Sequence, residues 1–163
     1  MKINIIRTII MILLLGNFYV IFQFSSQNGE KSGSLSEKLA ELVMQQLPIE
    51  ETQQSLKKTE SIIRKMAHFS IYTLLGFLLM SFVSTYHLKE DKRIVISLLI
   101  GILYAITDEI HQKFVPGRSC QITDVIIDSM GVLLGILLLL MLCEIHKKIK
   151  IKISRQNIAK SSN

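Results

Sequence analysis

Cysteine is scarce in this chain, with only two among 163 residues. Cys120 follows an acidic stretch, and Cys143 stands at the far end of the last apolar run. At ~1.5 Å per helical residue the two lie roughly 30 Å apart, far beyond the reach of a disulfide. The sequence therefore carries neither a disulfide framework nor a cysteine metal site.

The chain also lacks the short signatures of hydrolytic and metal enzymes. It contains no His-Glu-x-x-His, no Gly-x-Ser-x-Gly and no glycine-rich phosphate loop. It has no internal repeats, and its one low-complexity tract is the polar end at 161–163. A functional site must therefore be recognised from residues that converge in space, and whether such a site is enzymatic stays open.

Apolar residues, in contrast, are abundant and gathered into blocks. They make up 49% of the chain and form runs at residues 3–24, 66–86, 94–112 and 125–143. Each run is close to the ~20 residues that a membrane-spanning helix needs. The first run is long for a signal peptide and lacks a small-x-small cleavage site, so it is interpreted as an uncleaved anchor. We expect an all-α fold: one domain over residues 1–163, built as an integral membrane bundle of four transmembrane helices.

Positive charge is distributed unequally between the segments that connect these runs. With both termini inside, the inner segments carry most of the Lys and Arg, whereas the outer segments have a slight excess of acid. The positive-inside rule therefore predicts cytoplasmic termini. The net charge of +6 reflects this topology and gives no evidence for a nucleic-acid partner. The basic tail, residues 144–163, either lies on the anionic inner leaflet or is merely solvated.

The longest polar segment, residues 25–63, lies outside in this topology. Ser34 and Glu37 have the spacing of a capping box, and an apolar stripe follows as far as Pro48. The stripe consists of Leu35, Leu39, Leu42, Val43, Met44 and Leu47. It predicts one outer amphipathic helix, which lies on the membrane surface, covers the bundle mouth or only packs on the bundle. Residues 50–64 contain no Pro or Gly, so a second helix is expected to run straight into the next span.

Acidic residues stand at the end of the third run. The uncharged part of this run before them, residues 94–107, is about 21 Å long as a helix with a rise of ~1.5 Å per residue. The hydrocarbon layer of a membrane is ~30 Å thick, so this uncharged part is too short to cross it. Asp108 and Glu109 therefore lie at or below the membrane surface, where carboxylates are costly and by default mark function. At the start of the fourth run, Asp124 and Asp128 share a helix stripe with two glycines, Gly131 and Gly135. This stripe is expected to face other helices.

Three helix ends bring their polar residues to one outer membrane face. The second run enters from the outside, the third ends there, and the fourth begins there. The residues gathered in this way are Arg64, Lys65, His68 and Tyr72 from the second run, Asp108, Glu109, His111 and Gln112 from the third, Arg118 from the turn, and Asp124 and Asp128 from the fourth.

The chemistry of this set suits an anionic substrate. Close carboxylates can share a proton, act as acid and base, or bind a hard divalent cation, and His can move protons or ligate a metal. Cationic side chains bind phosphate or carboxylate. We assign as catalytic candidates Asp108, Glu109, His111 and His68, and as substrate-binding candidates Arg64, Lys65, Tyr72, Gln112, Arg118, Asp124 and Asp128. The sequence identifies no cofactor and no metal.

Each of these residues also has a purely structural interpretation. Asp128 could pair with Arg64 or His68, because charges buried in a membrane protein tend to pair with one another. Arg64 and Lys65 could be interfacial residues whose charged heads reach out to water. The number of ionisable groups at one end is the reason to favour a functional site.

The spacing of these residues resembles that of the VanZ-like family of bacterial membrane proteins. The resemblance rests on Arg64-Lys65-x-x-His68-Phe69-x-x-Tyr72-x-x-Leu75-Gly76, and on Asp108-Glu109-x-His111-Gln112-x-Phe114-x-Pro116-Gly117-Arg118 continuing to Asp124, Asp128, Gly131 and Gly135. Phe24-Ser25-Ser26-Gln27, with Ser32 and Ser36 downstream, is a further match. Asp128 departs from the family pattern, in which Asn is expected at this position at least as often as Asp.

The resemblance implies a small multi-pass protein of the bacterial plasma membrane, in a family associated with resistance to glycopeptide antibiotics, teicoplanin in particular. It assigns no reaction. We expect a cell-envelope protein whose outer-face pocket acts on a lipid-linked cell-wall precursor, with the lipid bilayer and an anionic precursor or a glycopeptide as partners. One alternative is a non-enzymatic binder that shields an envelope component. Another is a structural partner of a membrane complex that uses Gly131 and Gly135 as its contact stripe. The sequence does not indicate an oligomeric state.

Overall fold

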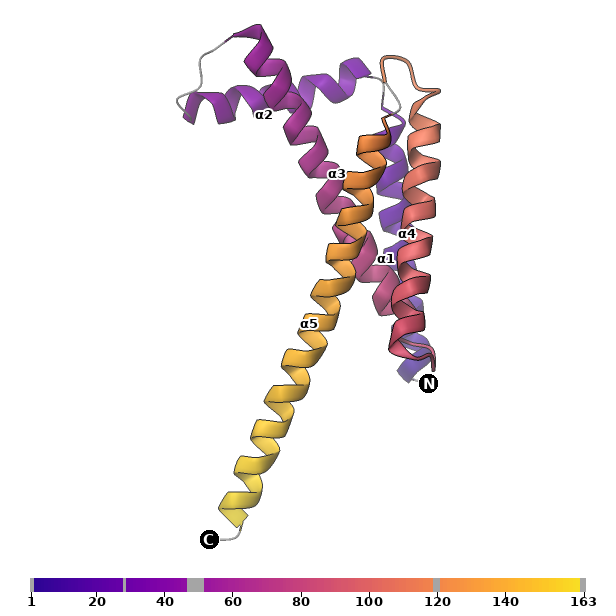
Figure 1. Cartoon of the computed structure of the whole chain (residues 1–163), viewed down its shortest axis with the longest axis vertical. Coiled ribbons are helices and arrows are strands. Elements are labelled where there is room, and N and C mark those ends of the chain that lie inside the picture. Colours follow the sequence, from indigo (N-terminus) through magenta and orange to yellow (C-terminus); the bar gives the residue numbers. More distant parts are fainter. Residues whose placement is uncertain (1, 28, 47–51, 119–120, 162–163) are drawn as a thin grey trace.

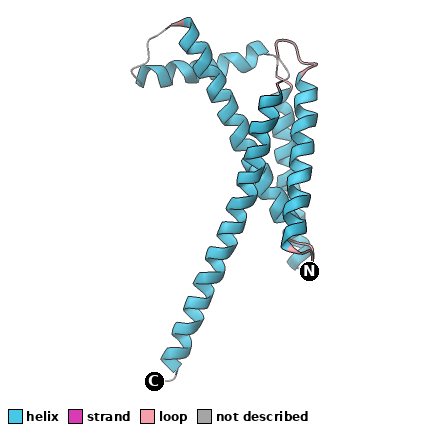
Figure 2. Cartoon of the chain, viewed as in Figure 1, coloured by secondary structure: helices cyan, strands magenta, loops and turns pink. Residues whose placement is uncertain are grey.

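The computed structural model describes residues 2–27, 29–46, 52–118 and 121–161, and every regular element within them is a helix (Figure 2). The helices are α1 (Lys2–Ser25), α2 (Gly29–Gln46), α3 (Gln53–Val83), α4 (Glu90–Gln112) and α5 (Ile122–Ser161). All except α2 contain a stretch long and apolar enough to cross a membrane. The predicted all-α bundle of four transmembrane helices, with a further helix in the first loop, is therefore confirmed.

The four spanning helices meet over part of their length and then diverge. α1 and α4 run beside α3, and α5 crosses α3 and continues well past the rest of the bundle (Figure 1). α2 lies across the bundle end at which α4 ends and α5 begins (Figure 1). We call this the acidic end, because Asp108, Glu109, Asp124 and Asp128 lie there. The two chain termini lie toward the opposite end (Figure 1).

The crossing of α3 and α5 depends on glycine. A Cβ added to Gly76 would overlap the backbone of Val132, and one added to Gly135 would overlap the carbonyl of Thr73. The two backbones therefore touch, as small residues allow in membrane helix pairs. The predicted stripe does face another helix, but that helix is α3. The suggestion that Gly131 and Gly135 contact a separate protein is wrong, because α3 already covers them.

α3 is one helix of 31 residues that begins before the membrane span. Thr52 caps it with a capping box in which its hydroxyl accepts from the Ser55 backbone N–H. The prediction that the stretch before residue 64 is helical and continuous with the second span is confirmed. α3 ends at Val83, three residues before the predicted end at 86, because the chain turns there and Arg7 Nη2 donates to the Thr85 carbonyl at 2.9 Å.

α2 differs from its predicted form in its start and its buried face. It begins at Gly29, so the predicted start at Ser34 is wrong, because Glu and Lys between them favour helix. Among its described side chains, the buried ones are Ser36, Ala40 and Met44, spaced four apart. Met44 belongs to the predicted stripe, whereas Leu39, Leu42 and Val43 of that stripe are exposed. Small side chains let α2 approach α3 closely, and the Ser36 hydroxyl donates to Glu60 Oε1 at 3.2 Å. Pro48 and Leu47, and the side chain of Leu35, lie outside the described part.

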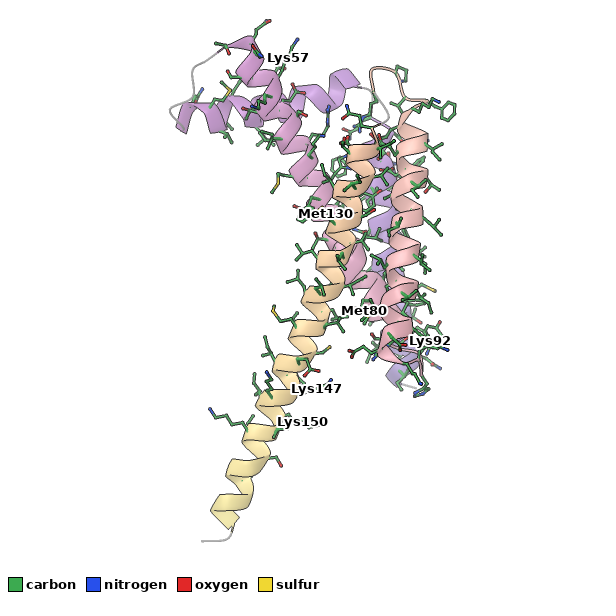
Figure 3. All side chains as sticks on the ribbon, in the orientation of Figure 1. Lys57, Met80, Lys92, Met130, Lys147 and Lys150 are labelled. Atoms are coloured by element: carbon green, nitrogen blue, oxygen red, sulfur yellow. The ribbon has the colours of Figure 1, made fainter. Side chains whose placement is uncertain are left out.

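The end of the bundle opposite the acidic end is basic. Lys92 lies at this end, and Lys147 and Lys150 lie on the part of α5 that extends beyond the bundle (Figure 3). Lys57, in contrast, lies at the acidic end (Figure 3). The predicted basic tail continues α5 as helix to Ser161. Cys143 is an exposed free thiol on this helix, and Cys120 lies outside the described residues.

Candidate functional site

The acidic end of the bundle holds most of the predicted site residues in one narrow pocket. Its lining comes from α3, α4, α5 and the turn between the last two helices: Arg64, Lys65, His68, Glu109, Gln112, Arg118, Asp124, Ile127 and Asp128. The pocket has a volume of about 20 Å³, which is room for one ion or one water. Three helices from separate parts of the chain are therefore needed to form it.

Asp128 and His68 form the deep part of this site. Asp128 is 2% exposed, and its Oδ2 lies 3.8 Å from His68 Nδ1. Asp108 is also buried, and its carboxylate, that of Asp128 and the His68 ring each bring one ligand atom into a group within 4.8 Å. Tyr72, one helical turn below His68, is fully buried, and its ring stacks on the His68 ring at a centroid distance of 6.5 Å. One imidazole and two carboxylates of the predicted residues therefore lie close together at the centre of the site.

Two more acidic residues occupy the rim and are paired there. Asp124 Oδ1 lies 2.8 Å from Lys65 Nζ, and both side chains remain about one-third exposed. Glu109 is buried, and its Oε1 accepts from the backbone N–H of Gln121 at 2.6 Å. Glu109 thereby fixes the start of α5 to the end of α4, which is a structural contact for a residue predicted to be catalytic.

Gln112 connects the centre of the site to α1. Its amide Nε2 donates to Asp108 Oδ2 and to the Ser25 hydroxyl, both at 3.2 Å. Its Oε1 accepts from Arg118 Nη1 at 3.1 Å. The buried amide thus orients the Asp108 carboxylate and the Arg118 guanidinium together.

Arg118 donates hydrogen bonds to two backbone carbonyls, one at the end of α1 and one just after it. Its Nη2 donates to the Phe24 carbonyl at 2.9 Å and its Nε to the Gln27 carbonyl at 3.2 Å. Burial and then the positive charge of Arg64 lower the pKa of the Arg118 guanidinium, which nevertheless stays charged as arginines do in proteins. Gly117, just before it, has a φ of 77°, the left-handed conformation that the turn requires. Two guanidinium groups therefore lie near each other at the pocket.

His111 contacts residues at the end of α1 and does not line the polar pocket. Its Nε2 lies 3.1 Å from the Ser26 hydroxyl, and its ring lies 5.0 Å from that of Phe22. It does not belong to the pocket lining among the described residues. Its visible contacts are with the end of α1.

A second, apolar cavity adjoins the polar pocket. This groove has a volume of about 140 Å³ and lies between α1, α2 and α3. It is lined by Ile21, Phe24, Gln27, Ser36, Leu39, Ile63, Ala67 and Ile71, together with Arg64, His68 and Arg118. The last three also line the polar pocket, so the two cavities share one wall. The groove is a feature that the sequence reasoning missed.

The contribution of α1 could have been found from the sequence. Ser25 and Ser26 contact Gln112 and His111, and both lie in the Phe24-Ser25-Ser26-Gln27 match. Polar residues at the end of an apolar helix are the same sequence pattern that predicted the contributions of the other three helices to the site. The apolar groove residues carry no such signal, because they are indistinguishable from lipid-facing ones.

As a whole, the arrangement offers acid–base groups, metal ligands and two cations beside an apolar surface. Searches of the curated proteins and of the solved structures each found no significant match. A family model, described as VanZ/LLP1, matches residues 9–143, which is most of the chain. The resemblance noted from the motifs is therefore confirmed, and the chain is a multi-pass membrane protein that belongs to the VanZ/LLP1 family.

Proposed function

We propose that this protein binds the anionic headgroup of a lipid-linked cell-envelope molecule at its acidic end and acts on it there. The observation that carries the proposal is the shared wall of the two cavities. Arg64, His68 and Arg118 line both the polar pocket and the apolar groove. A molecule with a charged head and a hydrocarbon chain would satisfy both at once.

Arg64 is the residue best suited to hold the headgroup. No ion pair joins it to another described residue, whereas Lys65 is paired with Asp124. A guanidinium binds a phosphate in a bidentate fashion, and such charge-assisted bonds are strong in a partly buried site. The polar pocket is too small for a whole headgroup, so the phosphate would lie at the shared wall beside Arg64 and His68.

The apolar groove is suited to the hydrocarbon chain. Most of its lining is aliphatic or aromatic, and it opens beside the membrane-spanning part of α3. Ala67, on that helix, has the smallest side chain in the lining and stays exposed. Its substitution by a large residue would fill the groove without altering the charged wall.

We further propose that the acidic end faces the outside of a bacterial plasma membrane, with both termini cytoplasmic. The basic residues Lys92, Lys147 and Lys150 lie away from the acidic end, as the positive-inside rule requires for that orientation (Figure 3). The lipid-linked molecule would then be a cell-wall precursor in the outer leaflet. Its binding would account for a contribution to glycopeptide resistance, including resistance to teicoplanin, which the family resemblance implies.

Two matched pairs of variants test the proposal on purified protein. Arg64→Gln removes the free guanidinium, and Arg93→Gln removes a half-buried one at the opposite end that pairs with Glu90. Ala67→Phe fills the groove, and Met66→Phe places the same ring on the neighbouring exposed position. With phosphatidylglycerol as the probe and native mass spectrometry as the readout, Arg64→Gln and Ala67→Phe should each lower the bound fraction at least fivefold. The two control variants should bind as the parent does.

In cells, the same variants distinguish enzymatic turnover of an envelope lipid from non-enzymatic shielding of that lipid. Envelope lipids are analysed by mass spectrometry with and without expression, and teicoplanin susceptibility is measured at matched membrane levels. A covalently altered lipid that disappears with Arg64→Gln supports turnover. Altered susceptibility with unchanged lipids supports the non-enzymatic shield instead. Parent-like lipid binding by both Arg64→Gln and Ala67→Phe would refute the site.

A further inference from the structure

The centre of the site has the composition of a three-ligand metal site. His68 from α3, Asp108 from α4 and Asp128 from α5 each offer one ligand atom, and these atoms lie within 4.8 Å of one another. A Zn²⁺ ion about 2.0–2.2 Å from its ligands holds those atoms roughly 3–3.6 Å apart. Small side-chain rotations would therefore close the three groups around an ion, with no movement of the helices.

An independent observation points to a missing partner at the same place. Asp128 is 2% exposed, yet its Oδ1 has no hydrogen-bond partner among the described residues. The Tyr72 hydroxyl, one helical turn from His68, is likewise buried and has no hydrogen-bond partner among the described residues. Buried polar atoms without a partner are rare in folded proteins. A partner that accepts electron pairs from Asp128 would complete the site.

The charge at the centre supports a divalent cation. Asp108 and Asp128 are two buried carboxylates in membrane-spanning helices, where charge that is not neutralised is costly. Among the neighbouring cations, Lys65 pairs with Asp124 and Arg118 donates to the Phe24 carbonyl. Arg64 lines the same pocket, but no ion pair joins it to either carboxylate. One divalent ion together with a neutral His68 would balance both carboxylates.

We propose that His68, Asp108 and Asp128 bind one Zn²⁺ or Mn²⁺ ion. A mixed set of one imidazole and two carboxylates lies between the preferences of these two metals and is less suited to Mg²⁺ or Ca²⁺. Gln112, which donates to Asp108 Oδ2, would orient that ligand from behind, as outer-shell partners do in metal sites. Three protein ligands leave an open position toward the polar pocket, which Asp128 and His68 line.

The open position gives the metal a role in the proposed function, although metal binding itself does not depend on that function. An oxygen of an anionic headgroup held by Arg64 would take the open position. The metal would then act as a Lewis acid on that headgroup. The proposal thus adds a cofactor to the site that the two cavities form.

The test measures metal directly on the full-length protein in detergent. The parent is stripped with a chelator, reloaded separately with Zn²⁺ and with Mn²⁺, desalted and analysed by inductively coupled plasma mass spectrometry. We expect one ion per chain with at least one metal. His68→Gln, Asp108→Asn and Asp128→Asn should each weaken binding at least tenfold in a competition titration. Asn at positions 108 and 128 retains one oxygen that can bind the ion but lacks the negative charge, so these two variants measure mainly the contribution of that charge.

Matched controls are available at the other end of the bundle. His87→Gln and Asp91→Asn remove the same chemical groups from exposed positions and should bind metal as the parent does. Circular dichroism and the elution profile establish that each variant is folded. A parent that retains no metal after loading, or ligand variants that retain it as well as the parent, would overturn the proposal. Metal loss with phosphatidylglycerol binding intact refutes only the metal site, whereas the reverse result refutes only the proposed lipid binding.

Discussion

At the scale of single residues, the site depends on a few buried polar groups whose roles are mainly to orient others. Gln112 holds Asp108, Ser25 and Arg118 through one amide. Arg118 in turn donates to backbone carbonyls at the end of α1 and just after it. The contacts with Ser25, Phe24 and Gln27 join parts of the chain that are 87 to 94 residues apart, so their loss should affect stability as well as binding.

Replacement of Gln112 by Leu tests this orienting role. The change conserves volume but leaves the Asp108 and Ser25 partners of the amide unsatisfied in a buried place, at a cost of about 1–3 kcal/mol. Thermal unfolding in detergent should therefore occur several degrees lower than in the parent. Gln45→Leu, at an exposed position of α2, is the control and should leave the transition unchanged. An unchanged transition for Gln112→Leu would show that the network carries no stability.

At the scale of elements, the position of the site is set by the crossing of α3 and α5. Contact between the two backbones near Gly76 and Gly135 fixes the rotation of both helices. That rotation determines which side chains at the acidic end face each other, including His68 and Asp128. A change at the crossing should therefore alter the site, which lies about two helical turns away.

Gly135→Ala should disturb the crossing, because the added Cβ overlaps the Thr73 carbonyl and the neighbouring backbone cannot yield without moving α3. Overpacking of this kind costs about 1–3 kcal/mol. Gly16→Ala is a matched control, since a Cβ on that α1 glycine meets nothing within 4 Å. We expect a lower unfolding temperature and weaker phosphatidylglycerol binding for Gly135→Ala alone. Equal behaviour of the two variants would mean that α3 and α5 do not pack as described.

At the scale of the whole molecule, the two ends of the bundle differ in charge and in chemistry. The acidic end combines the polar pocket, the apolar groove and α2, whereas the other end carries Lys92 and the basic extension of α5 (Figures 1 and 3). The proposed orientation places the first end outside. This orientation is a property of the protein in its membrane and can be measured directly.

Single cysteines measure the orientation in intact cells. In a background with Cys120→Ser and Cys143→Ser, Lys57→Cys and Lys150→Cys place one thiol on each exposed end (Figure 3). A membrane-impermeant maleimide should label Lys57→Cys in intact cells, and should label Lys150→Cys only after permeabilisation. The opposite pattern would place the site on the cytoplasmic side and exclude an outer-leaflet substrate.

The observed site agrees with the predicted one for most residues and differs from it at His111, while the buried face of α2 also differs from its prediction. Helical spacing and the order of the spans were enough to indicate that Arg64, His68, Asp108 and Asp128 lie at one end. The same spacing did not reveal that His111 contacts Ser26, because a residue at the edge of a helix face can turn to either neighbour. It also did not reveal which face of α2 is buried. Ser36 and Ala40 are buried there since their small size suits α3, although hydrophobicity favours Leu39 and Leu42.

The sequence by itself determined the membrane spans, their order and the end at which the ionisable residues lie, because each follows from the length of an apolar run or from helical periodicity. The tertiary structure alone decided which partners those residues have. It paired Lys65 with Asp124, tied Arg118 to α1 and brought His68, Asp108 and Asp128 within 4.8 Å. Such contacts depend on the rotation and crossing of helices, which are set by close packing at Gly76 and Gly135 and by no pattern within a single helix.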